Sequence, residues 1–316
     1  PTTSKNGREE LDMMQVILAL DAAAREQHPA SMGMTRVWSL CGNHDLLNFD
    51  LPKYESIRES FWTDVTVQGF GGWQGREDFF RTGTPVGNYM AFTRPPAVQL
   101  GPWIFVHGGI NLEALGDFKN AYYRPGREEV KEAKEEEEER GGFLRFLTQV
   151  YGAVLRKDAA YLKTMTKHGE VEHSRKSRRA ADDMYRHQDM PEAICTLMEF
   201  REQGKQKPGF DGCSSKAMDI ARFFGVQDAW KQGRGGMAVS HTVQTNVGVN
   251  STCGGLVWRV DAALSEAFGR REEENPCQPF QILVIDTNKS TAEVRTIRAN
   301  KPGFETNYTT PEACSR

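Results

Sequence analysis

The sequence lacks several features that would assign a function class directly. No apolar run approaches the roughly 20 residues that a membrane-spanning helix needs, so we expect no membrane span. The sequence also lacks a large excess of charge of one sign, because 40 basic residues nearly balance 43 acidic ones and leave a formal net charge of −3. A chain without a global basic field is not expected to bind nucleic acid. The sequence starts at Pro1 instead of Met, so it stays open whether a targeting segment was removed or was not captured in this sequence.

Cysteine motifs are absent as well. Six cysteines stand far apart, with no C-x-x-C pair and no zinc-knuckle spacing, at positions 41, 195, 213, 253, 277 and 314. In a chain of 316 residues this pattern favours reduced thiols in an intracellular protein. We therefore predict an intracellular location, with the cytoplasm favoured and organelle targeting left open. Cys41 ends a predicted strand and fits a small core residue better than a nucleophile.

What is present is a mixture of helix and strand patterns. Apolar residues at three- and four-residue steps predict helices over 9–26, 53–62, 191–202 and 214–224. Short apolar runs predict strands over 36–40, 103–106, 237–240 and 256–260. Two further runs, 281–286 and 293–297, flank turn residues and predict a hairpin. The mixture predicts an α/β (α+β) fold, a β-sandwich of parallel and antiparallel strands flanked by helices.

One region differs in composition from the rest. Residues 127–140 read REEVKEAKEEEEER and residues 173–179 read HSRKSRR, so acidic and basic charge are concentrated in separate runs. Such runs are most often solvated surface or a mobile insert. We predict a single domain over residues 1–316 with a charged helical insert over 112–182.

Three motifs carry the chemistry of the chain. They are Gly42-Asn43-His44-Asp45, Val106-His107-Gly108-Gly109 and Ser240-His241-Thr242, and each follows a short apolar run. Because open α/β sheets place their sites at the carboxyl ends of strands, we expect these polar residues to meet at one edge. The remaining histidines are interpreted as structural, and they are His28, His168, His173 and His187.

The residue types in the motifs suit a transition-metal site. Asn43, His107 and His241 supply one amide oxygen and two imidazoles, which are ligands for Mn, Fe or Zn. Two such ions about 3.5–4 Å apart promote hydrolysis of phosphate esters. His44 is adjacent to Asn43 but should point elsewhere, so it can protonate the leaving oxygen as a general acid.

Four stretches resemble the calcineurin-like metallophosphoesterases, specifically the PPP-type Ser/Thr protein phosphatases and most closely their Shewanella-like branch. They are CGNHDLLNF, FFRTGTPVGNYMA, WIFVHGGI and SHTVQTNVGVNSTCGGLVWRVDAALSEAFG, and the resemblance extends from about Val37 to Ile285. It implies a metallophosphoesterase fold and a phosphoprotein substrate.

The resemblance also implies roles for individual residues. Asn43, His107 and His241 would bind the second of two metal ions, and His44 would be the general acid. Asp45 stands where the family usually has Glu. Tyr185-Arg186 resembles a segment whose arginine contacts the substrate phosphate, so Arg186 would bind two phosphate oxygens. The predicted catalytic residues are therefore His44, Asp45 and Arg186.

The first half of the family's metal centre is missing. The family carries an Asp-x-His motif and a Gly-Asp-x-x-Asp-Arg-Gly motif before the Asn-His turn, and neither is in this sequence. We hypothesise that residues upstream of Pro1 supply them, together with the missing N-terminal strands. At most one of the two metal sites is then represented here, and we expect the 316-residue piece alone to be inactive.

Two other functions stay open at this point. The chain could be an inactive phosphatase-fold scaffold or a subunit of a larger protein assembly, which the acidic insert and the missing motifs favour. Converging imidazoles favour the enzyme, because a scaffold has no physical need for them. A phosphodiesterase or nucleotidase of the wider superfamily is the third reading, and only the resemblance argues against it.

Overall fold

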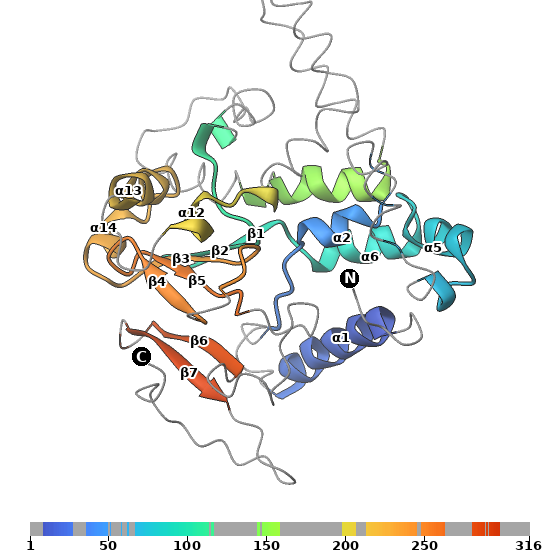
Figure 1. Ribbon diagram of the computed structural model, residues 1–316, viewed down its shortest axis with the longest axis horizontal. Coiled ribbons are helices and arrows are strands. Elements are labelled where there is room, and N and C mark those ends of the chain that lie inside the picture. Colours follow the sequence, from blue (N-terminus) through green and yellow to red (C-terminus); the bar gives the residue numbers. More distant parts are fainter. Residues whose placement is uncertain are drawn as a thin grey trace, which may run out of the picture. The chain divides into compact units, whose positions relative to one another are not determined.

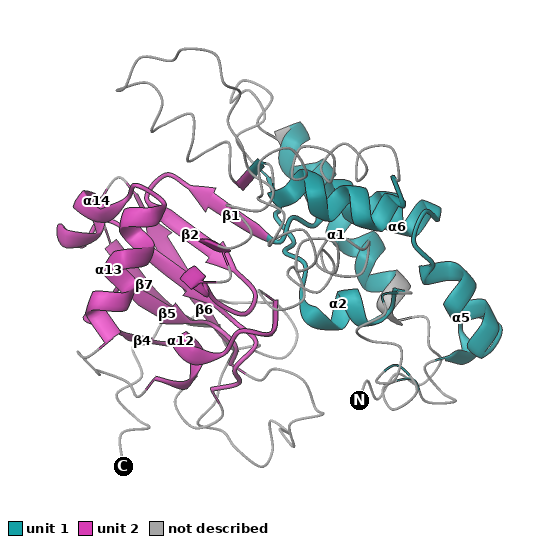
Figure 2. Ribbon diagram, turned by 90° about the horizontal axis from the view of Figure 1, so that it is seen from above, with its two compact units in different colours: residues 1–96, 118–124, 145–196 teal, residues 97–117, 125–144, 197–316 magenta. Residues whose placement is uncertain are grey.

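The computed structural model describes residues 9–27, 36–49, 51, 58, 62, 67–113, 115–116, 144–145, 147–158, 198–206, 213–244, 248–262, 280–287, 289 and 291–297. Its contacts divide the chain into two compact units (Figure 2). Unit 1 comprises residues 1–96, 118–124 and 145–196, and unit 2 comprises residues 97–117, 125–144 and 197–316. The mixed helix and strand content confirms the α/β class. The sandwich and the single domain stay predictions, and most of the predicted insert lies outside the described residues.

The labelled elements of unit 1 are helices (Figure 1). They are α1 (Glu9–Gln27), α2 (Asn43–Leu47), α5 (Trp73–Phe80) and α6 (Pro85–Thr93). The start of α6 has the usual residues of a helix N-terminus. The Thr84 side chain accepts a hydrogen bond from the Gly87 N–H at 3.4 Å, and Pro85 occupies the first turn. Gly87 also allows a close approach, since a Cβ there would lie 2.6 Å from the Leu155 carbonyl oxygen.

The strand predicted over residues 36–40 is wrong. Residues 36–42 have no regular secondary structure, and α2 begins directly after them. A strand needs a neighbouring strand to share its backbone hydrogen bonds, and here the bonds go elsewhere. Val37 N–H donates to the Asp21 carboxylate at 3.0 Å, and Cys41 N–H donates to the Pro95 carbonyl at 3.1 Å.

A five-stranded mixed sheet forms the centre of unit 2. Its strands run in the order β1-β2-β3-β5-β4 and are β1 (Ala97–Leu100), β2 (Trp103–Val106), β3 (Gly236–Val239), β4 (Asn250–Thr252) and β5 (Val257–Arg259). β2, β3 and β5 are parallel, whereas β1 and β4 pair antiparallel at the two edges. All four residues of β3 are buried, as expected for a central parallel strand covered on both faces. The predicted strands over 103–106, 237–240 and 256–260 are thereby confirmed to within a residue or two.

Short helices accompany this sheet. They are α12 (Glu202–Lys205), α13 (Ser214–Phe223) and α14 (Gln227–Lys231). α13 confirms the helix predicted over 214–224, and it buries Ala217, Ile220 and Ala221. The indole N–H of Trp230 on α14 donates to the Pro102 carbonyl at 2.7 Å and so fixes α14 to the turn between β1 and β2. Within the part of the chain that the structure describes, no helix is long and apolar enough to cross a bilayer.

The predicted hairpin is confirmed as β6 (Phe280–Asp286) and β7 (Thr291–Ile297), which pair antiparallel along their whole length. Gln281 attaches the hairpin to the sheet, because its side-chain oxygen accepts a hydrogen bond from Val249 N–H at 2.7 Å. Val249 directly precedes β4, so the hairpin is held at the start of that edge strand.

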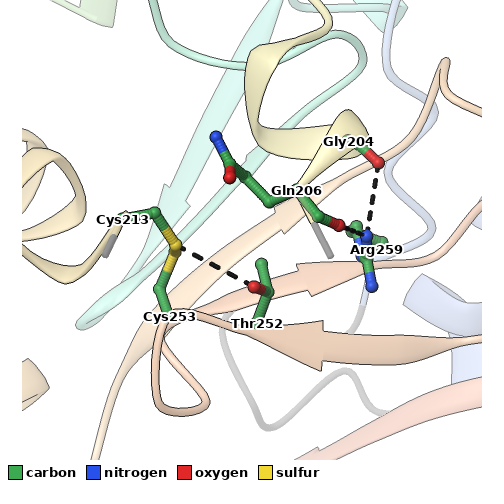
Figure 3. Close-up of a disulfide and its surroundings, with 6 residues drawn as sticks. All are labelled: Gly204, Gln206, Cys213, Thr252, Cys253 and Arg259. Carbon is green, nitrogen blue, oxygen red and sulfur yellow. Dashed lines mark hydrogen bonds between the residues drawn. A yellow bond between two sulfur atoms is a disulfide. The ribbon is translucent and has the colours of Figure 1, made fainter. Parts of the chain in front are cut away.

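The expectation of reduced cysteines is wrong for one pair. Cys213 and Cys253 form a disulfide across 40 residues of sequence, with their Cα atoms 5.2 Å apart (Figure 3). That separation lies within the usual range for disulfides. Cys213 precedes α13 and Cys253 follows β4, so the bond joins a helix start to the β4–β5 turn. Cys41 is buried, as expected for a core residue.

Candidate functional site

Two of the predicted ligands, His107 and His241, meet in unit 2. His107 follows β2 directly, and His241 stands two residues beyond β3. Because these strands are parallel neighbours, their carboxyl ends share one edge of the sheet. The Ser240 N–H donates to the His107 carbonyl at 2.8 Å and extends the pairing past the strands. The rings converge, with His107 Nε2 3.2 Å from His241 Nδ1 and ring centroids 4.9 Å apart.

The backbone at His241 adopts a conformation that L-residues rarely take. Its φ is 62°, in the left-handed region. A non-glycine residue there costs of order 1–2 kcal/mol. Such strain persists only when the surrounding contacts determine it, and it is concentrated at functional sites. His241 is also 8% exposed. Its ring also lies against that of His107, so a strained position and a specific contact coincide.

The donor set and its spacing fit a shared metal ion. Two nitrogens bound at about 2.0–2.1 Å to a tetrahedral ion lie about 3.3 Å apart. The observed 3.2 Å between His107 Nε2 and His241 Nδ1 matches that separation. The same distance also suits an N–H···N hydrogen bond when one ring carries the proton at that nitrogen.

The pair does not form a full ligand set by itself. Among the described residues, no group of three or more His, Cys, Asp or Glu side chains could hold a metal ion. The third predicted ligand, Asn43, is a residue of unit 1, where its side chain is 8% exposed. Its role as a ligand stays a prediction from the sequence.

The Gly42-Asn43-His44-Asp45 motif forms the first turn of α2 rather than a turn after a strand. Gly42 is the residue before the helix, and its N–H donates to the Asp45 carboxylate at 2.8 Å. This is the acidic half of a capping box and satisfies a backbone donor at the helix start. Asn43 is buried whereas His44 is exposed, so neighbouring residues of the motif face different surroundings. His44 is therefore accessible to a molecule in solution.

The contacts of Asp45 are structural ones. Besides the Gly42 N–H, its carboxylate accepts a 2.5 Å hydrogen bond from Arg94. The side chains of Arg94 and Asp45 are 11% and 27% exposed, so this ion pair is screened less than a surface pair. Arg94 follows α6, and the pair thus links the end of α6 to the start of α2. A catalytic role for Asp45 stays a prediction.

The other end of α2 is held by a buried arginine. Asn48 follows the helix, donates to the His44 carbonyl at 3.0 Å and accepts from Arg76 at 2.7 Å. Arg76 is 2% exposed and its guanidinium lies 4.8, 5.2 and 5.3 Å from the ring centres of Phe70, Phe80 and Trp62, respectively. Cation–π attraction offsets part of the cost of burying this charge. Both ends of the short helix are therefore fixed by long-range contacts.

Tyr151 is a buried residue close to the motif. Burial raises the pKa of its phenol well above the ordinary value of 10.0, and the neighbouring Cys41 thiol raises the pKa further. Asp45 acts in the same direction, while Arg94 acts in the opposite one. The phenol therefore stays neutral at physiological pH and does not act as a base.

Sequence reasoning found both histidines of the pair but missed the residues that support the motifs. Arg94, Arg76 and Tyr151 carry no local signal, because each meets α2 or its flanks from a distant part of the chain. Arg186, the predicted phosphate ligand, lies outside the described residues, as do Tyr185 and the helix predicted over 53–62 apart from Arg58 and Trp62.

Comparisons with known proteins place few limits on function. No protein-family model matches the chain, and no solved structure matches it. An uncharacterized protein of Acanthamoeba polyphaga mimivirus is 31% identical over 78 residues, which is 23% of this chain and 31% of the viral protein. The chain thus matches about a third of the length of that relative.

Proposed function

We propose that this chain is part of a metal-dependent phosphoprotein phosphatase, with His107 and His241 as two ligands of one metal ion. The observation that supports the proposal is the 3.2 Å approach of His107 Nε2 to His241 Nδ1 at the ends of adjacent parallel strands. The ligand types favour Mn, Fe or Zn. When bound, a pair of such ions supplies Lewis-acid activation of the phosphate ester and of the attacking water.

In this proposal the protein side chains bind the ester and move one proton. His44 protonates the leaving oxygen, and its exposure on α2 suits contact with a large phosphoprotein substrate. Asp45 and Asn48 hold the two ends of α2, so they fix the position of the backbone that carries His44. Asn43 would complete the ligand set and Arg186 would bind phosphate oxygens, both on the resemblance alone. This ligand set would form one of the two metal sites, and the Asp-x-His and Gly-Asp-x-x-Asp-Arg-Gly motifs that the family uses for the other are not in this sequence.

The test uses the full-length protein expressed from its gene. We expect about two transition-metal ions per chain and hydrolysis of an aryl phosphate. The His241→Ala variant should lose about one ion per chain. His44→Ala should keep its metal and lose about 10²–10⁴-fold in turnover, the usual contribution of a general acid.

His173→Ala is the matched control, because that histidine belongs to the basic run and is predicted to be structural. It should change neither metal content nor turnover. A full-length protein without bound metal, or one whose hydrolysis survives His44→Ala unchanged, would exclude the phosphatase and leave the scaffold.

A further inference from the structure

The two histidine turns share a neighbour, the short helix α12. The Gln203 side-chain N–H donates to the Ile110 carbonyl at 2.8 Å, three residues after His107. Gly204 packs against Thr242, the residue directly after His241, so closely that a Cβ would lie 2.3 Å from the Thr242 hydroxyl oxygen. One turn of helix therefore contacts both segments that carry the rings.

Buried polar groups hold α12 in this place. Gln244 is 7% exposed, and its amide donates to the Gly204 carbonyl at 3.0 Å and to the Thr242 carbonyl at 2.7 Å. It therefore connects the helix to the residue after His241 through two hydrogen bonds from one side chain. Asn250 donates in turn to the Gln244 oxygen at 3.4 Å and so orients the amide.

Arg259 at the end of β5 completes the arrangement. It is 3% exposed and donates to the Gly204 carbonyl at 3.4 Å, to the Gln206 carbonyl and to the Asn250 side chain. Figure 3 shows its guanidinium directed at the carbonyls of Gly204 and Gln206, at the end of α12. Carbonyls at a helix end have no partner within the helix, and a cation there also interacts favourably with the helix dipole.

From these contacts we infer that Gln203, Gly204, Gln244, Asn250 and Arg259, here called the α12 network, position His107 and His241 relative to each other. We call them positioning residues because the hydrogen bonds described above run to backbone carbonyls and to one another. The network explains how the strained backbone at His241 persists, because Gln244 and Gly204 fix the residue that follows it. The inference rests on the proposed function only in its statement about metal binding. The effect of the network on the spacing of the two rings does not depend on a bound metal.

The test compares two variants that disturb the network from different sides. Gly204→Ala introduces a Cβ against Thr242, and Gln203→Met removes the donor to Ile110 at similar volume. Cobalt(II) is the probe, because its visible spectrum reports imidazole ligands in the full-length protein. We expect each variant to weaken cobalt binding by about 10–100-fold, the usual cost of losing contacts that support metal ligands. Melting temperatures identify any variant that does not fold.

A compensating change separates positioning from general loss of stability. Removing the Thr242 side chain in Gly204→Ala/Thr242→Gly vacates the space that the new Cβ needs, so cobalt affinity should recover towards that of Thr242→Gly alone. Gly116→Ala is the matched control, since Gly116 is a helical glycine of unit 2 with nothing within 4 Å of the added Cβ. It should leave cobalt affinity unchanged.

The NMR contact between the ring protons of His107 and His241 in metal-free protein provides the second readout. If the wild-type protein binds no cobalt, the proposed metal site fails, but loss of this contact in the variants would still support the network. Folded variants that keep the ring contact would overturn the inference, and so would variants that keep the full cobalt affinity of a wild type that binds cobalt.

Discussion

At the scale of single residues, the side chains that pack near the Asn43-His44 motif include polar groups that are almost fully buried. Tyr151 is 1% exposed and Cys41 is fully buried, and the pKa of the Tyr151 phenol is influenced by the Cys41 thiol, by Asp45 and by Arg94. A buried phenolate would cost far more than a buried phenol. The folded protein therefore keeps the Tyr151 proton at a pH where the unfolded chain releases it.

This difference predicts a specific alkaline sensitivity. Since the folded pKa of Tyr151 is raised above the ordinary value of 10.0, the unfolded state binds fewer protons above pH 10. Stability is complete below that pH and falls above it by about 1.4 kcal/mol per pH unit, until the folded pKa is reached. In Tyr151→Phe this loss is absent. Urea unfolding from pH 8 to 11 should show the stability of the wild type falling relative to that of Tyr151→Phe as pH rises, and parallel curves would contradict the assignment.

At the scale of elements, α1 is secured by one carboxylate. Its apolar residues Met13, Val16 and Leu20 are more than half exposed. Asp21 instead accepts hydrogen bonds from Arg25 on the same helix and from Arg36 and the Val37 N–H, the segment that precedes the motif. Burial by itself would raise the pKa of Asp21, but these donors outweigh it and lower the pKa from 3.8 to about 2.

Replacing this carboxylate should loosen α1 in a pH-dependent way. Because the folded pKa is lowered, the stabilisation is present above pH 3.8 and is lost as pH falls towards 2. After allowance for solvent screening, Asp21→Asn should cost about 1–2 kcal/mol at pH 7 and flatten the acid dependence. Asp78→Asn is the control, since its pair with Arg81 is about half exposed and should contribute less than about 1 kcal/mol. Equal losses in urea titrations of both variants would contradict a special role for Asp21.

The helices and strands also show which parts of the fold could be predicted from apolar patterns in the sequence. Periodicity predicted α1, α13, the hairpin and the strands that end at His107 and His241, because each has an apolar pattern of its own. It failed at residues 36–40, where the apolar pattern fits a strand but the backbone bonds go to Asp21 and Pro95. Pairing partners, like the distant contacts of Arg94 and Gln203, are properties of the folded chain that no local window contains.

At the scale of the whole molecule, the cysteines also show that contacts between distant parts of the chain cannot be predicted from local sequence. Spacing alone predicted reduced thiols, yet Cys253 turns back after β4 and meets Cys213 at the start of α13 (Figure 3). The bond lies entirely within unit 2 and connects the β4–β5 pair, which carries Asn250 and Arg259, to the helical part of that unit. The intracellular location stays a prediction, and the expectation of reduced thiols no longer supports it.

The disulfide should therefore be a large contributor to the stability of unit 2. Closing 40 residues of chain reduces the entropy of the unfolded state by an amount worth about 4 kcal/mol. Urea unfolding of Cys213→Ser/Cys253→Ser should show a loss of that order, and a reducing agent should lower the wild type to the same level. The reducing agent should have no effect on the double variant, which makes that variant its own control. If mass spectrometry of the unreduced protein found alkylated thiols at both positions, the disulfide and the predicted loss would both be refuted.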